Sequence, residues 1–166
     1  MLGVGERFPH YLLMAVVTAV DGDPFQPVSD REFRGRWKIY IFWPKDFTDL
    51  ALSEIVDFGD LLPELEERDT DLIGCSVETE NAHLAWRQQE KELRALNFPM
   101  LADVKRQLCG ELGILDEAEG TAQPAVFVVD PQDVIRFVYV TESNVSRDPG
   151  EVLRVLADLQ QGSEKR

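Results

Sequence analysis

Thiol groups are the most reactive side chains that this sequence offers, and it contains two of them, Cys75 and Cys109. Cysteine thiolates serve as nucleophiles, redox groups and metal ligands. The chain also has two histidines, His10 and His83, but no combination of these four residues has the spacing of a zinc site. We therefore predict a protein without a metal centre or a cofactor.

Neither cysteine has the surroundings that a reactive thiol needs, which are nearby cationic groups. Cys75 lies in the apolar segment Asp71–Val77, where a free cysteine usually acts as a small core residue. Cys109 lies between Leu108 and Gly110, and we expect a structural or partly exposed thiol. Because the chain shows no export signal, both thiols are expected to be reduced. A slow reaction of Cys109 with peroxides remains as an alternative.

Alternating strands and helices must position these groups. In chain order we predict a strand over Lys38–Trp43, a helix over Ser53–Glu67, a strand over Asp71–Val77, helices over Asn81–Ala95 and Lys105–Leu112, a hairpin of Ala125–Val129 with Ile135–Thr141, and a helix over Asp148–Leu159. Pro63 should split or kink the first helix, and Gly113 should end the third. This order predicts an α/β fold, with a central mixed sheet flanked by helices.

The size and the charge of the chain exclude several classes of function. Its 166 residues suit one domain, residues 1–166. A net charge of -14 opposes binding to nucleic acid or to an anionic membrane. No segment approaches the ~20 apolar residues of a membrane span. The apolar stretch Tyr11–Val20 is too short and lacks the basic leader of a signal peptide. We expect a cytoplasmic protein that binds neither nucleic acid nor membranes.

The segment Phe42–Glu54 reads FWPKDFTDLALSE. It resembles the active-site signature of the peroxiredoxin family, in the alkyl hydroperoxide reductase C and thiol-specific antioxidant branch, which runs close to FFPKDFTFVCPTE. Further segments resemble that family in the same order: Asp71–Val77 with His83–Trp86, Phe98–Asp103 with Lys105 and Arg106, Val128–Pro131, and Ser146–Leu156. The resemblance runs from about Phe33 to Leu159 and implies a thioredoxin fold of the peroxiredoxin type.

The resemblance also implies a site and a chemistry. In the family, a thiolate at a helix N-terminus attacks a peroxide and becomes a sulfenic acid. A threonine and an arginine hold the peroxide, and a proline shields the site. The corresponding positions here are Thr48, Arg147 and Pro44, while the position of the peroxidatic cysteine is occupied by Ala51. A methyl group is no nucleophile, so we expect no peroxide reduction there.

Other family features are also missing. Leu52 replaces the usual proline after the cysteine, and Asp49 replaces a phenylalanine that commonly lies at the family's dimer contact. A negative charge at Asp49 would raise the pKa of a neighbouring thiol. No cysteine follows Cys109, whereas the family's resolving cysteine lies in a tail after the last helix. The resemblance still implies at least a homodimer, or a higher ring of dimers.

Two hypotheses follow for the function. In the first, the chain is a pseudo-peroxidase with a binding or assembly role, because three changes cluster at Asp49, Ala51 and Leu52. In the second, it is a thiol peroxidase for hydrogen peroxide or alkyl hydroperoxides whose cysteine at position 51 has been replaced by alanine. The second hypothesis requires an external thiol reductant protein as partner. We favour the first, since a designed change would normally alter one residue.

Overall fold

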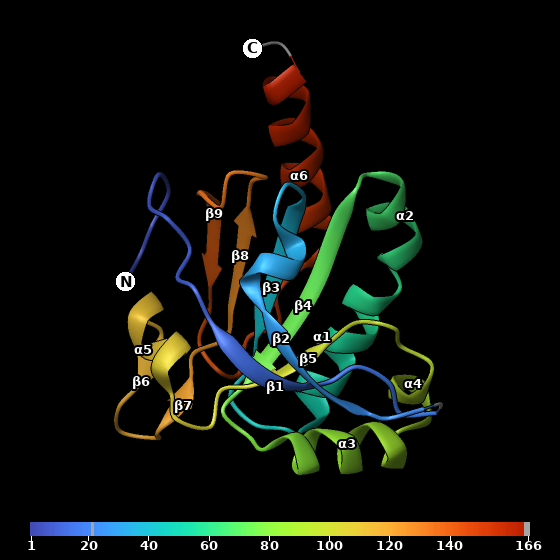
Figure 1. The fold of residues 1–166 in the computed structure, drawn as a ribbon. Helices are drawn as coiled ribbons and strands as arrows, with labels where there is room; N and C mark the ends of the chain where they lie inside the picture. The colour runs from blue at the N-terminus through green and yellow to red at the C-terminus, as the bar shows by residue number, and fades with distance from the viewer. Residues whose placement is uncertain (21, 165–166) are drawn as a thin grey trace.

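The computed structural model describes residues 1–20 and 22–164, and a seven-stranded mixed sheet forms its centre (Figure 1). The strands are β1 (Leu12–Val16), β2 (Phe25–Ser29), β3 (Trp37–Phe42), β4 (Thr70–Ser76), β5 (Met100–Ala102), β8 (Ala125–Val129) and β9 (Ile135–Val140). Their order in the sheet is β2-β1-β5-β4-β3-β8-β9. The β3–β4 and β4–β5 pairs are parallel and the others antiparallel. The predicted mixed sheet is confirmed.

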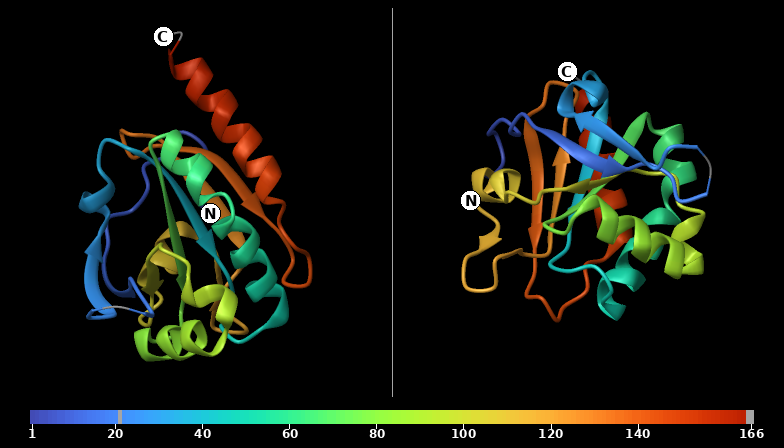
Figure 2. Two further views of the ribbon diagram at one scale, coloured as in Figure 1. Left: turned by 90° about the vertical axis from the view of Figure 1, so that its right-hand side faces the viewer. Right: turned by 60° about the horizontal axis from the view of Figure 1, so that its bottom comes forward.

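Helices cover both faces of this sheet (Figure 2). They are α1 (Asp49–Gly59), α2 (Leu62–Glu67), α3 (Glu80–Gln89), α4 (Lys91–Arg94), α5 (Gln107–Leu112) and α6 (Pro149–Glu164), with a 3-10 turn, η1, at Asp30–Phe33 and a small hairpin of β6 (Leu115–Asp116) and β7 (Thr121–Ala122). Among the described helices, none has both the length and the apolar character needed to cross a membrane.

Side chains along the central strands point alternately to the two faces of the sheet, so the core is divided into two clusters. On β3, Ile39 and Ile41 pack with Ile55 and Phe58 of α1, whereas Tyr40 and Phe42 face the opposite cluster, which contains both cysteines. All four strand residues are buried, because both faces of the sheet are covered by other elements. This burial explains why the strand reads as a continuous apolar run.

Two predicted helices are divided in the structure. Pro63 lies in the first turn of α2, where its missing N–H costs no hydrogen bond, so the predicted break after α1 is confirmed. The prediction of one helix over Asn81–Ala95 was wrong in its continuity, because Glu90 adopts an extended conformation between α3 and α4. At the other end, α6 continues past the predicted end at Leu159.

Candidate functional site

Thr48 begins helix α1 and fixes the position of Ala51. Its backbone is extended, and its hydroxyl accepts a hydrogen bond from the backbone N–H of Ala51, with 3.4 Å between the two atoms. The same hydroxyl donates to the carbonyl oxygen of Lys45 at 3.2 Å. Ala51 therefore lies in the first helical turn, where free N–H groups and the helix dipole favour negative charge.

Removal of this N-cap is expected to destabilise the protein. Thr48→Ala leaves the N–H of Ala51 without its acceptor, and loss of such a cap costs about 0.5–2 kcal/mol. Because the hydrogen bond is long, at 3.4 Å, we expect a loss of ~1 kcal/mol in the free energy of unfolding, measured with urea. Thr48→Ser keeps the hydroxyl and should lose less than half as much; equal losses would show that the cap is not responsible.

A buried polar network holds the loop before α1. The carboxylate of Asp46 accepts hydrogen bonds from Trp43 Nε1 at 2.7 Å and from the Ser76 hydroxyl at 3.0 Å, and it contacts His83 Nδ1 at 2.5 Å. His83 Nε2 lies 2.9 Å from the carbonyl oxygen of Leu101. A carbonyl oxygen only accepts, so Nε2 donates the hydrogen bond to Leu101.

This network positions Phe47, which precedes the helix in a left-handed conformation with φ of 64°. A bulky residue rarely adopts that conformation, so the neighbouring contacts must hold it there. The ring of Phe47 lies beside the Trp86 ring, with 6.1 Å between centroids, and the side chain remains 49% exposed. The contacts of Asp46 and Phe47 therefore hold the loop that leads into α1.

A cavity of about 910 Å³ opens at this end of α1. Pro44, Thr48 and Ala51 line one side of it, together with Lys45, Leu50 and Glu54. The other side is formed by residues of β6, β7 and two loops: Leu115, Asp116, Glu117, Glu119, Thr121, Ala122, Gln123, Pro124, Thr141, Glu142 and Ser143. The described lining residues include five carboxylates, one lysine and no cysteine or arginine. Negative charge therefore dominates the walls of the cavity.

Arg147 lies behind the cavity wall and not in it. Its side chain is 1% exposed, and its Nε donates to Glu54 Oε2 at 2.9 Å. Nη2 donates to Glu54 Oε1 at 3.3 Å, and Nη1 donates to the carbonyl oxygen of Ala125 at 2.6 Å. The backbone N–H of Arg147 also donates to Glu54. This guanidinium therefore binds α1 to the start of β8 and α6.

The structure brings together three of the four residues that the resemblance indicated, since Pro44, Thr48 and Ala51 share the cavity. Arg147 lies outside the lining and reaches it through its ion pair with Glu54, which is a lining residue. Neither cysteine lines the cavity: both are buried in the cluster that contains Tyr40 and Phe42, on the other side of the sheet from α1. The sequence analysis missed the Asp46–His83 pair and the Glu54–Arg147 pair, because their members lie 37 and 93 residues apart and no local pattern joins them.

Comparison with known proteins agrees with this fold. Residues 4–138 match the model of the AhpC/TSA family. Alkyl hydroperoxide reductase C from Mycolicibacterium smegmatis is 44% identical, over 96% of this chain and 86% of its own. The structure of Mycobacterium tuberculosis AhpC has a TM-score of 0.90 at 42% identity, covering 96% of this chain and 99% of that one. Enterococcus faecalis AhpC has a TM-score of 0.92 at 27% identity, covering 99% and 96%.

These similarities define a thioredoxin-fold protein of the peroxiredoxin class. Within that class, the chain belongs to the AhpC/TSA family and to its alkyl hydroperoxide reductase branch. The resemblance read from Phe42–Glu54 and the later segments is thereby confirmed.

Proposed function

We propose that this chain retains the peroxiredoxin fold in a single domain, residues 1–166, but not the peroxidase chemistry, and that it acts as a binding or assembly module. The observation that carries the proposal is the methyl group of Ala51 in the first turn of α1, beside Thr48. A peroxidatic site needs a sulfur at such a position, where the helix N-terminus stabilises a thiolate. Ala51 supplies no nucleophile.

The electrostatics of the cavity support the same proposal. A thiolate that attacks a peroxide needs a cation to lower its pKa and to hold the peroxide oxygens. The guanidinium of Arg147 is bound to Glu54, which leaves Lys45 facing the other four carboxylates of the lining. We therefore propose that Pro44 and Thr48 line a former peroxide pocket, and that Arg147 now stabilises the fold rather than a substrate.

The competing proposal is an active thiol peroxidase that carries a cysteine at position 51 in its natural form. Three retained features favour it: Pro44, Thr48 and the intact first turn of α1. Under this proposal the gene has a cysteine codon at position 51, and Ala51→Cys alone restores rapid peroxide reduction by an external thiol protein. Under our proposal, Ala51→Cys does not.

An assembly role predicts that the chain forms a homodimer or a ring of dimers. The half-buried Phe137, Val138 and Tyr139 lie on β9, an edge strand that offers unpaired backbone groups to a second copy. Sedimentation velocity at micromolar concentration should give a mass at least twice that of the 18.9 kDa chain. A monomer under these conditions would contradict the assembly role.

The net charge of -14 supports a protein partner rather than nucleic acid. The buried, reduced thiols fit a cytoplasmic location.

A further inference from the structure

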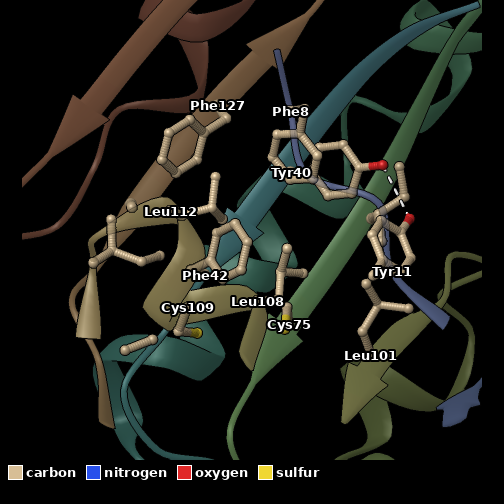
Figure 3. Close-up of a cluster of buried hydrophobic side chains, with 14 of the residues drawn as sticks. Phe8, Tyr11, Tyr40, Phe42, Cys75, Leu101, Leu108, Cys109, Leu112 and Phe127 are labelled. Atoms are coloured by element: carbon tan, nitrogen blue, oxygen red, sulfur yellow. Dashed lines mark hydrogen bonds between the residues drawn. The ribbon is translucent and has the colours of Figure 1, made fainter. Parts of the chain in front are cut away.

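The small hairpin of β6 and β7 turns one face to the core and the other to the cavity. Leu115 of β6 and Ala122 of β7 are paired, and both pack on the apolar cluster that contains Phe42 (Figure 3). Side chains on a strand alternate between its two faces, so the other pair, Asp116 and Thr121, points away from that cluster. Both residues of this second pair line the cavity.

Thr121 has a hydroxyl group that the protein itself leaves unused. The residue is only 8% exposed, and its hydroxyl forms no hydrogen bond with any residue that the structure describes. Among the described side chains, the unpaired polar atom that is closed off from solvent is Nε of Arg87, so the Thr121 oxygen can be reached from the cavity. Because buried hydroxyls are usually hydrogen-bonded, this one is available to a ligand.

The carboxylates of the lining are mostly without a cationic partner. Four of them form no ion pair with any part of the chain that the structure describes: Asp116, Glu117, Glu119 and Glu142. The fifth, Glu54, is paired with Arg147. Lys45 is the one cation in the described lining, and Arg106, beside the hairpin, lies outside it and donates to the carbonyl oxygen of Gly120. Like charges around one cavity repel one another, so a bound cation relieves the repulsion.

The arrangement of these carboxylates suits an extended cation better than a single metal ion. Within residues 1–20 and 22–164, no three His, Cys, Asp or Glu side chains form a group that could hold a metal. The cavity, at about 910 Å³, has the usual size of a small-molecule site. Its lining also contains the apolar residues Pro44, Leu50 and Pro124. A ligand that matches these walls carries several positive charges separated by apolar segments.

We propose that the cavity binds a linear aliphatic polyamine. Its ammonium groups donate to the unpaired carboxylates and to the Thr121 hydroxyl, and its methylene groups pack on the apolar part of the lining. The net charge of -14 attracts such a cation from solution. This inference rests on the proposed function, since it names the ligand of the binding site that the former peroxide pocket has become.

Isothermal titration calorimetry with spermine, a linear tetraamine, tests the proposal on the full chain at about 0.15 M salt. We expect saturable binding of one spermine per chain. The double variant Glu117→Gln/Glu119→Gln should weaken binding about 10-fold, because two ion pairs with the ligand are lost. The matched control, Glu64→Gln/Glu66→Gln, removes the same charge from exposed positions on α2 outside the lining, and should weaken binding less than about 2-fold. Equal weakening by the two variants would overturn the proposal, because the attraction would then come from net charge alone.

Thr121→Val tests the hydroxyl without a change in charge. The valine keeps the shape of the side chain, and spermine binding should weaken roughly 3–10-fold, the usual contribution of one hydrogen bond. The free energy of unfolding in urea should not fall, since the hydroxyl has no partner among the described residues. Unchanged spermine binding in Thr121→Val would contradict the proposed contact.

Failure of this inference can be told apart from failure of the proposed function. A chain that shows no saturable binding of spermine, or that binds an oligolysine peptide in the cavity but not spermine, would overturn the polyamine site. Neither result would restore a nucleophile at Ala51. Peroxidase activity of the unmodified chain would refute the proposed function and leave the spermine titration unaffected.

Discussion

Replacement of Arg147 by methionine is expected to lower the free energy of unfolding by about 3–5 kcal/mol, the usual cost of leaving one member of a buried ion pair without its partner. Glu54 is 5% exposed, and in Arg147→Met its carboxylate would keep only the backbone N–H of residue 147 as a donor. The carbonyl oxygen of Ala125 would lose its side-chain donor too. Urea denaturation followed by circular dichroism measures the change.

The double variant Glu54→Gln with Arg147→Met is the control for this prediction. It removes both charges, so no ionised group is left buried, while the amide oxygen of the glutamine can still accept from the backbone N–H of residue 147. We expect the double variant to be more stable than Arg147→Met alone. A loss below ~1 kcal/mol for Arg147→Met, which is typical of surface pairs, would contradict a structural role for the pair.

Ala51→Cys is expected to reduce hydrogen peroxide about 10²–10³-fold more slowly than alkyl hydroperoxide reductase C of Mycobacterium tuberculosis under the same conditions, the usual cost of losing one preorganised donor in an active site. The new thiol would lie at the N-terminus of α1, which favours the thiolate. Four carboxylates in the lining oppose it, and Arg147 is bound to the fifth, Glu54. The cavity thus supplies a hydroxyl, at Thr48, but no free guanidinium.

Two measurements make the Ala51→Cys prediction specific. The rate of alkylation of the new thiol against pH should show a pKa near the ordinary value for cysteine, ~8.5, rather than the strongly lowered value of a reactive thiol. Ala51→Ser, which has similar size but no sulfur, should give no peroxide reduction above the unmodified chain. Activity of Ala51→Cys equal to that of the mycobacterial protein would favour the alternative, a thiol peroxidase that lacks only the thiol of its cysteine at position 51.

The elements that could be predicted from the sequence are those with a strong local pattern. The hairpin of β8 and β9 is confirmed, since apolar strands flank a turn at Asp130–Asp133. The end of α5 is confirmed as well, with Gly113 left-handed at φ of 76°. By contrast, β5 has three residues, too few for any periodicity, and it was not predicted.

The site was predictable in part, for a similar reason. The segment around Thr48 and Ala51 is contiguous, so its type could be recognised from a short stretch of sequence. The position of Arg147 depends on Glu54, which is 93 residues away in the sequence. The ion pair between them forms only in the tertiary structure, so no local pattern predicts it. Arg87 shows the same limit: it is fully buried and donates to carbonyl oxygens of Val16 and Phe98, although its helix reads as polar.

The most direct test of the proposed function is peroxide turnover by the unmodified chain. Purified protein is mixed with hydrogen peroxide and, separately, with an alkyl hydroperoxide, with dithiothreitol as reductant, and peroxide loss is compared with that of a Cys75→Ala/Cys109→Ala variant. We predict equal rates for the two proteins, both at the level of the reductant alone. Rapid consumption by the unmodified chain, absent from the cysteine-free variant, would contradict the account.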